Sequence, residues 1–276
     1  IFLELIRKQP LGAAGGAIVV IMILMAIFAE LLTVFDPELN DLEHMLMPPD
    51  DVFWLGTDQF GRDSLTRIVF GARTELLVGF TCAMVGATLG LVLGVASAFF
   101  GGMFDLIVQR VVDVVMAFPL IILALAVVAT LGPGTQNVII AITIPFVPQC
   151  ARVVRSSALA IREIPYIDAA RALGFSDTRI ILRHMVPNVM APYLIMLTSF
   201  LGQAILLEAS LSYLGMGVQE PTPAWGLMLQ GGAEEFAESA PWIAIWPGVA
   251  ISLAVFGFNL FGDSVRDMLD PKLRSR

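Results

Sequence analysis

The sequence YIDAARALGFSDTRIILRHMVPN, from Tyr166 to Asn188, is a polar, arginine-bearing stretch between two long apolar runs. It predicts two short helices, because Gly174 ends the first and Ser176 is a suitable N-cap for the second. Pro187 marks where the second helix stops or bends into the next apolar run. A short helix held at the membrane surface between two spans is suited to docking into a groove on another protein.

The first of these helices carries a small, flat apolar patch beside two charged residues. The patch and its flanking charges are formed by Ala169, Ala170, Ala172, Leu173, Asp168 and Arg171. We interpret this helix as a coupling element that receives force from a soluble partner. The alternative is a re-entrant or merely interfacial helical loop.

The composition places the chain in a membrane. Of its 276 residues, 57% are hydrophobic and only 14% are charged, and a soluble domain has far more charge. Apolar runs of about twenty residues are long enough to cross a bilayer as helices. We count six, at 11–35, 75–100, 105–131, 136–155, 188–214 and 242–262. They lack the short alternation of a membrane barrel, so the predicted fold class is an all-α polytopic membrane protein.

The distribution of basic residues predicts the orientation, because Lys and Arg near helix ends stay in the cytoplasm. They gather before the first span, in the connection at 151–187 and in the tail: Arg7, Lys8, Arg152, Arg155, Arg162, Arg171, Arg179, Arg183, Arg266, Lys272, Arg274 and Arg276. We therefore expect both termini and a coupling loop at 156–187 to be cytoplasmic. The segments at 36–73 and 215–241 should face outward; the loop at 216–241 has four glutamates and no basic residue.

Several function classes are not favoured by the sequence. The net charge of −8 lies largely on the outer segments, which argues against a nucleic-acid partner. Cys82 and Cys150 lie in or near predicted spans, so we expect neither a disulfide nor a zinc cluster. No phosphate-binding loop and no hydrolase motif occurs, so we expect no bound cofactor, no metal and no catalytic residue. Because the first residue is Ile1, we expect a short N-terminal arm before it and a retained first span.

The outer stretch from Trp54 to Gly79 alternates acidic and basic residues, with Asp58 and Asp63 beside Arg62 and Arg67. Its apolar residues predict a helix lying in the membrane interface. One interpretation is an anchoring helix with solvated ion pairs. The other is a surface that meets an outer partner or shapes the mouth of a pathway, together with Trp225 from the outer loop.

Polar and proline residues interrupt the predicted spans. Gln203 and Glu208 lie in otherwise apolar surroundings, and an ionisable group inside a span suggests a pathway or an internal polar contact. For Glu208, a structural bond to a neighbouring helix and a position near the outer interface are the alternatives. Pro119 should kink the third span, and Arg110 with Asp113 should form an i, i+3 pair at its border.

Five motifs in order along the chain resemble those of permease subunits in binding-protein-dependent ABC importers. They are LGTDQFGRD (55–63), FGAR (70–73), the central stretch, EASLSYLGMGVQEPTPAWG (208–226) and FNLFGDSVRDMLDPKLR (258–274). The central stretch resembles the EAA loop of that family. The details are similar to the C-type permease of the dipeptide, oligopeptide and nickel branch, and the resemblance covers nearly the whole chain.

The resemblance implies the type I ABC importer permease fold, with an EAA-type coupling helix seated in a cleft of an ATP-hydrolysing subunit. The implied coupling residues are Asp168, Ala169, Ala170, Arg171, Gly174, Phe175, His184 and Pro187. Asp168 departs from the family's usual Glu, and His184 stands where the broad pattern has an aliphatic residue. The implied partners are a second permease chain, two ATPase subunits that bind ATP and Mg²⁺, a solute-binding protein outside the inner membrane, and membrane lipid.

The expected substrates are di- or oligopeptides, moved by alternating access. Nickel chelates, glutathione-like peptides, opines and oligosaccharides are alternatives within the same importer class. A homo-oligomeric pore and a structural membrane subunit are alternatives of another class. Both leave the acidic outer loops and the five matched motifs unexplained.

Overall fold

The computed structural model describes residues 10–269, and the predictions that concern Arg7, Lys8, Lys272, Arg274 and Arg276 lie outside them. Within this range the chain is helical and has no strand, apart from a single bridge between Thr57 and Asp63. The helical elements in chain order are α2 (Pro10–Ile27), α3 (Ala29–Leu32), η1 (Leu42–His44), α4 (Ser64–Phe100), α5 (Gly102–Met116), α6 (Leu120–Leu131), α7 (Thr135–Arg162), α8 (Pro165–Ala172), α9 (Asp177–Ile180), η2 (Ile181–Met185), η3 (Val186–Val189), α10 (Met190–Tyr213), α11 (Trp225–Glu235) and α12 (Trp242–Leu269).

Five continuous helical stretches in this range are long and apolar enough to cross a membrane: 10–27, 64–100, 135–162, 177–213 and 242–268. A sixth crossing requires α5 and α6 together, and these two helices are bent by 91° at the break between them. The break falls at Phe118 and Pro119, where the proline was expected to kink the span. The prediction of an all-α polytopic membrane protein is confirmed.

The outer helix predicted within Trp54–Gly79 differs from the structure. Residues from Ser64 onward belong to α4, a single helix of 37 residues that continues into the second predicted span. At 1.5 Å per residue it is about 55 Å long, well beyond the ~30 Å of a bilayer's hydrocarbon core. Asp63 caps its first turn by accepting a hydrogen bond from the Thr66 amide at 2.8 Å. The segment predicted to lie in the interface is therefore the N-terminal end of a helix long enough to span the membrane.

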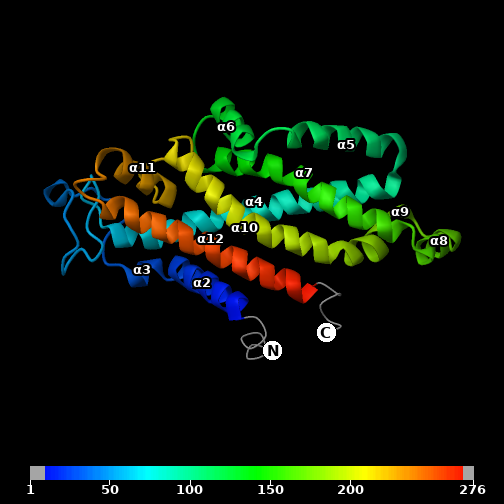
Figure 1. Cartoon of the computed structure of the whole chain (residues 1–276), viewed down its shortest axis with the longest axis horizontal. Coiled ribbons are helices and arrows are strands. Elements are labelled where there is room, and N and C mark those ends of the chain that lie inside the picture. The colour runs from blue at the N-terminus through cyan, green and yellow to red at the C-terminus, as the bar shows by residue number, and fades with distance from the viewer. Residues whose placement is uncertain (1–9, 270–276) are drawn as a thin grey trace.

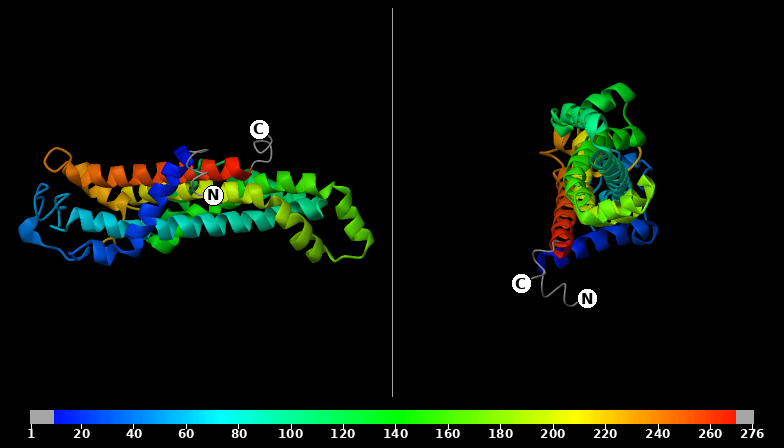
Figure 2. Two further views of the ribbon diagram at one scale, coloured as in Figure 1. Left: turned by 90° about the horizontal axis from the view of Figure 1, so that it is seen from below. Right: turned by 90° about the vertical axis from the view of Figure 1, so that its right-hand side faces the viewer.

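The helices form a long bundle with distinct ends (Figure 1). The loops between α3 and α4 and the segment around α11 lie at one end, and α8 and α9 project from the other (Figures 1 and 2). Helices α4 and α7 pack closely because glycines of α4 face α7. A methyl group added at Gly90 would lie 2.5 Å from the Cys150 Cβ, and one added at Gly86 would lie 2.7 Å from the Phe146 Cβ. Small residues at these positions let the two helices approach closely.

The first helix packs across the last one. Figure 2 shows that α2 crosses the bundle obliquely and lies next to α12. Gly12 and Gly15 permit this approach, because a methyl group at Gly12 would clash with the Ser264 Cβ and one at Gly15 would lie 2.6 Å from the Leu260 Cβ.

Helix α5 presents its charged residues to α7. The expected i, i+3 ion pair of Arg110 with Asp113 is present, at 3.9 Å. Asp113 also accepts a hydrogen bond of 2.5 Å from Arg152, and Asp105 accepts two from Arg155, at 2.6 Å and 2.5 Å. These pairs between helices neutralise charges that would otherwise be costly near the membrane.

Candidate functional site

The end of α8 is formed by a Schellman motif. The Phe175 amide donates to the Ala170 carbonyl at 3.1 Å, and the Gly174 amide donates to the Arg171 carbonyl at 2.9 Å. Gly174 has φ +77°, a backbone conformation that glycine adopts without steric cost. Gly174 therefore ends the helix, as expected, and the chain reverses direction directly after it.

Only part of the predicted apolar patch faces outward. The side chain of Asp168 is 73% exposed, and Ala169, Ala172 and Leu173 are also exposed. Ala170, in contrast, is buried and belongs to the core of this chain, so the prediction that it joins the docking patch requires correction. The exposed set occupies one side of α8, as the helical period requires for residues 169, 172 and 173.

The second half of the loop departs from simple α-helix. Ser176 occupies the N-cap position of α9, but its side chain makes no capping bond. The chain then passes through the π-helical segment η2 and the 3₁₀ segment η3 before α10 begins. Pro187 lies in the first turn of η3 and has no amide hydrogen to donate, which fits a change of helix type at that point.

An aromatic cluster joins the two halves of the loop. Tyr166 donates through its hydroxyl to the His184 carbonyl at 3.0 Å, and Asn188 donates to the same carbonyl at 2.7 Å. The His184 ring lies between Tyr166 and Phe175, with ring centroids 5.9 Å and 6.1 Å away. His184 thus packs inside the loop and ties α8 to the start of the α10 span.

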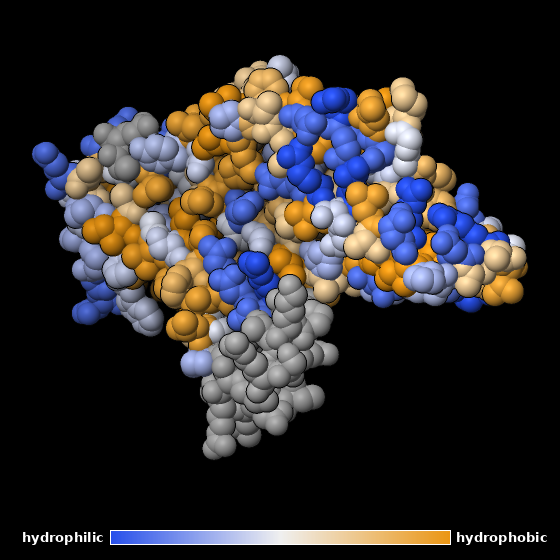
Figure 3. All heavy atoms as spheres, turned by 45° about the vertical axis from the view of Figure 1, so that its right-hand side comes forward, coloured by the Kyte–Doolittle hydropathy of each residue, from blue (hydrophilic) through white to orange (hydrophobic). Residues whose placement is uncertain are grey.

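The same loop is tied to the end of α4. The Arg171 guanidinium lies 5.4 Å from the centre of the Phe99 ring and 3.3 Å from the Asp168 carboxylate. Arg162 at the end of α7 donates to the Ala98 carbonyl at 2.8 Å. A push on α8 would therefore reach α4 through Arg171 and the η2–η3 segment before α10 through Tyr166. Figure 3 shows hydrophilic and hydrophobic side chains mixed on the projecting end that carries this loop.

At the opposite end, the charged residues of the outer motif form a buried network. Arg62 donates to Asp58 at 2.7 Å and to Glu220 at 2.6 Å and 3.0 Å. Arg67 has no exposed surface; it donates to the Pro37 and Pro221 carbonyls at 2.8 Å and 3.2 Å. The interpretation of these residues as solvated ion pairs is not supported, because they join the two outer segments from inside.

The charge network also controls the ionisation of Glu220. Burial alone would raise the pKa of Glu220, but the hydrogen bond from Arg62 and the positive charges of Arg67 and Arg62 outweigh it. The pKa of this carboxyl group therefore lies below its ordinary value. The carboxylate form is the one that holds the outer segments together.

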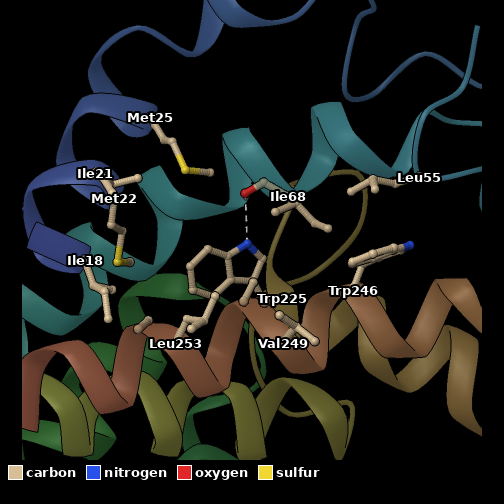
Figure 4. A pocket seen from close by; sticks show the side chains of 12 residues that line it. Ile18, Ile21, Met22, Met25, Leu55, Ile68, Trp225, Trp246, Val249 and Leu253 are labelled. Carbon is tan, nitrogen blue, oxygen red and sulfur yellow. Dashed lines mark hydrogen bonds between the residues drawn. The ribbon is translucent and has the colours of Figure 1, made fainter. Parts of the chain in front are cut away.

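Trp225 is also buried within this chain. Its indole N–H donates to the Ile68 carbonyl at 2.9 Å (Figure 4). Gly71, in the FGAR motif, leaves room for the ring, because a methyl group there would lie 2.7 Å from two indole atoms. The five residues predicted for an outer partner or mouth, Asp58, Arg62, Asp63, Arg67 and Trp225, all have buried side chains. Their direct contacts are with the segments around them.

The two pathway candidates lie on different sides of α10. Gln203 is exposed, whereas Glu208 has no exposed surface. Ser212 donates to Glu208 at 2.5 Å, and the Glu208 carboxyl also interacts with that of Glu75 from α4. Of the two positions that the prediction left open for Glu208, the structure places it in contact with a neighbouring helix.

Comparison with known families matches most of the chain. Residues 86–275 match the model of the binding-protein-dependent transport system inner membrane component, and residues 2–49 match that of the N-terminal transmembrane domain of oligopeptide transport permease C. The chain belongs to the family of inner membrane components of binding-protein-dependent transport systems. It is accordingly a multi-span membrane permease.

Individual relatives cover nearly the full chain. The dipeptide transport system permease protein DppC of Alkalihalophilus pseudofirmus is 44% identical over 98% of this chain and 88% of its own length. The glutathione transport system permease protein GsiD of Pectobacterium atrosepticum is 39% identical over 97% of this chain and 89% of its own length. A chain of the inward-facing MetNI methionine ABC transporter is similar in fold, with a TM-score of 0.60 and 20% identity over 75% of this chain and 97% of that one.

Sequence reasoning missed two acidic residues of the site. Glu220 was noted only as one of four outer glutamates, and nothing in its local sequence points to Arg62, which lies 158 residues away. Glu75 was not singled out, although an available signal existed: it is an isolated acid followed by a long apolar run, and such a residue demands a partner.

Proposed function

We propose that this chain is one of two homologous permease subunits in an ATP-driven ABC importer that moves peptides across the inner membrane. The observation that carries the proposal is the geometry of α8. It ends in a tight reversal, projects from one end of the bundle, and exposes Asp168, Ala169 and the following Leu173, while it remains tied to α4 and to the η2 segment that precedes α10. That arrangement suits a helix that seats in a cleft of an ATPase subunit and passes its motion to the spans.

The mechanism is alternating access. ATP and Mg²⁺ bind in two ATPase subunits, whose closure moves α8 and opens the permease pair to the outside. A solute-binding protein, docked on the outer segments at 36–73 and 215–241, then delivers the peptide, and hydrolysis returns the pair to the inward-open state. In this orientation α8 and both termini are cytoplasmic, as the basic residues around the coupling loop indicate.

Two substrate classes are supported by relatives. The relative at 44% identity is named for dipeptides, and that at 39% is named for glutathione. Di- or oligopeptides are therefore the first candidate, and a glutathione-like tripeptide is the second. We place Gln203 on the pathway shared with the second permease, because it is the exposed polar residue of the two α10 candidates.

The experiment has two stages. The chain is purified from its native membrane in mild detergent, and co-purifying proteins are identified and counted by mass spectrometry. The complex is then reconstituted in vesicles, and ATP-dependent uptake of labelled dipeptide, oligopeptide and glutathione is measured with the binding protein present. Recovery of a second permease with ATPase subunits and peptide uptake supports the proposal. Recovery of this chain alone as a stable homo-oligomer, which conducts solute without ATP, contradicts it.

A further inference from the structure

Two glutamate side chains meet inside the bundle, between α4 and α10. Glu75 belongs to α4 and Glu208 to α10, and neither has any exposed surface. Their carboxyl groups lie close enough to interact with each other. Contact between two acids at a fully buried place is unfavourable when both are ionised, because each charge loses its hydration and repels the other.

The surroundings contain no positive charge to compensate. Within the part of the chain that the structure describes, no basic side chain forms an ion pair with either carboxyl group. The groups that face the pair are the Ser212 hydroxyl, the Trp225 backbone amide and, among titratable groups, the buried Cys82 thiol. The last two lie on α11 and α4, and all three are neutral.

The donors around the pair leave one oxygen of each acid unpaired. Ser212 donates to Oε1 of Glu208 at 2.5 Å, and the Trp225 amide donates to Oε1 of Glu75 at 3.2 Å. The Oε2 atoms of both glutamates are buried without a donor from any described side chain or backbone group. A proton on one carboxyl group supplies that missing donor and turns repulsion into a short, charge-assisted hydrogen bond.

We propose that Glu75 and Glu208 form a buried proton-binding site, in which one proton is shared by the two carboxyl groups and locks the outer segment 218–225 to α4 and α10. The proton comes from water, and no other chemical change is involved. This site is independent of the importer assignment, since it concerns how one chain holds its own outer segment.

The bonds around the pair reach both ends of that segment. At its start, the Val218 amide donates to the Ser212 hydroxyl oxygen at 3.0 Å, and this hydroxyl donates onward to Glu208. At its end, the Trp225 amide donates to Glu75. The shared proton is the link between these two halves. Its loss leaves two adjacent negative charges, which push α4 from α10 and loosen the segment.

The first test is infrared spectroscopy of the assembled permease complex. The proposal predicts a carbonyl stretching band of a protonated carboxyl group at neutral pH, one that exchanges slowly in deuterated water. The band should be lost in the double variant Glu75→Gln/Glu208→Gln and kept in the matched control Glu43→Gln, an exposed outer acid. Absence of the band in the unmodified complex, or its persistence in the double variant, overturns the proposal.

The second test follows the segment directly and uses a variant that keeps the hydrogen bond. Glutamine at 208 donates permanently through its amide, so Glu208→Gln should keep segment 218–225 protected from hydrogen exchange from neutral to alkaline pH. In the unmodified complex, protection of this segment should fall as pH rises and the pair loses its proton. Equal loss of protection in both proteins at alkaline pH contradicts the proposal. This comparison remains informative if the double variant does not assemble.

Discussion

The guanidinium of Arg62 donates two hydrogen bonds to the carboxylate of Glu220, with Nη1–Oε2 and Nη2–Oε1 distances of 2.6 Å and 3.0 Å. Its Nε donates a third to Asp58 at 2.7 Å. This one side chain therefore joins the two segments that are expected to face outward. A planar, forked group is required to satisfy both acids together.

Replacing Arg62 with lysine should destabilise the outer end. Lysine keeps the charge but cannot reproduce the paired bonds, so we expect a loss of about 1–3 kcal/mol in the free energy of unfolding. Thermal unfolding in detergent measures it. The matched control is Arg110→Lys, because Arg110 is exposed and its nearest acid is 3.9 Å away. Equal melting temperatures for the Arg62 variant and the unmodified protein would refute this role for the network.

The lowered pKa of Glu220 predicts a dependence on acid pH. Since the folded pKa lies below the unfolded one, the unfolded state binds more protons between the two values, and stability rises with pH there. The contribution is complete above the unfolded pKa of about 4.3 and is lost as pH falls through the folded pKa. The variant Glu220→Gln lacks this contribution. Its free energy of unfolding should therefore differ from that of the unmodified protein above the unfolded pKa, and the two free energies should converge below the folded pKa. A constant difference at all acid pH values would argue against the assignment.

Gly174 provides a test of the loop's backbone. No atom lies within 4 Å of an added methyl group, so the penalty of a side chain arises from φ +77° alone. Gly174→Val should reduce ATP-dependent uptake and destabilise the α8 end by roughly 1–2 kcal/mol, whereas Gly174→Asn, which tolerates this conformation, should retain most activity. Gly16→Ala, at an ordinary helical position where the nearest atom to an added methyl group is 3.6 Å away, serves as control. Similar behaviour of the valine and asparagine variants would show that the conformation is unimportant.

A substitution at Gly71 tests the packing of the Trp225 ring. An added methyl group would lie 2.7 Å from the indole ring, so Gly71→Ala must displace the ring and weaken its bond to the Ile68 carbonyl. We expect a loss of about 1–3 kcal/mol in stability from this overpacking. Hydrogen exchange at the start of α11 should also increase. Gly248→Ala, where the nearest atom is 4.0 Å away, should have little effect, and indistinguishable results for the two would contradict the close packing.

Local signals in the sequence predicted much of the fold. Runs of apolar residues predicted the spanning helices. Pro119 predicted the break between α5 and α6, and Gly174 predicted the end of α8. Each of these depends on a residue's own conformational preference or on a pattern of neighbours. The start of α4 was misjudged, because a helix that lies in the interface and one that begins a span have the same amphipathic first turns.

Contacts between segments that are far apart along the chain could not be predicted from the sequence. Ala169 and Ala170 are identical residue types, yet one is exposed and the other is buried, because only one face of α8 packs against the rest of the chain, including α9. Asp113 forms the expected ion pair with Arg110 three residues away, but its closer pair with Arg152 on another helix was not predicted. Glu75 and Glu208 lie far apart along the chain and meet only once α4 packs on α10.

The coupling role of α8 is the central claim, and Asp168→Lys tests it most directly. The variant complex is purified, its subunit content is checked, and ATP hydrolysis and peptide uptake are measured in the same vesicles. We predict that uptake falls roughly tenfold, within the range of typical coupling free energies, while Asp267→Lys, an exposed charge reversal at the end of α12, transports normally. Normal uptake per ATP hydrolysed by an Asp168→Lys complex of normal composition would contradict the account.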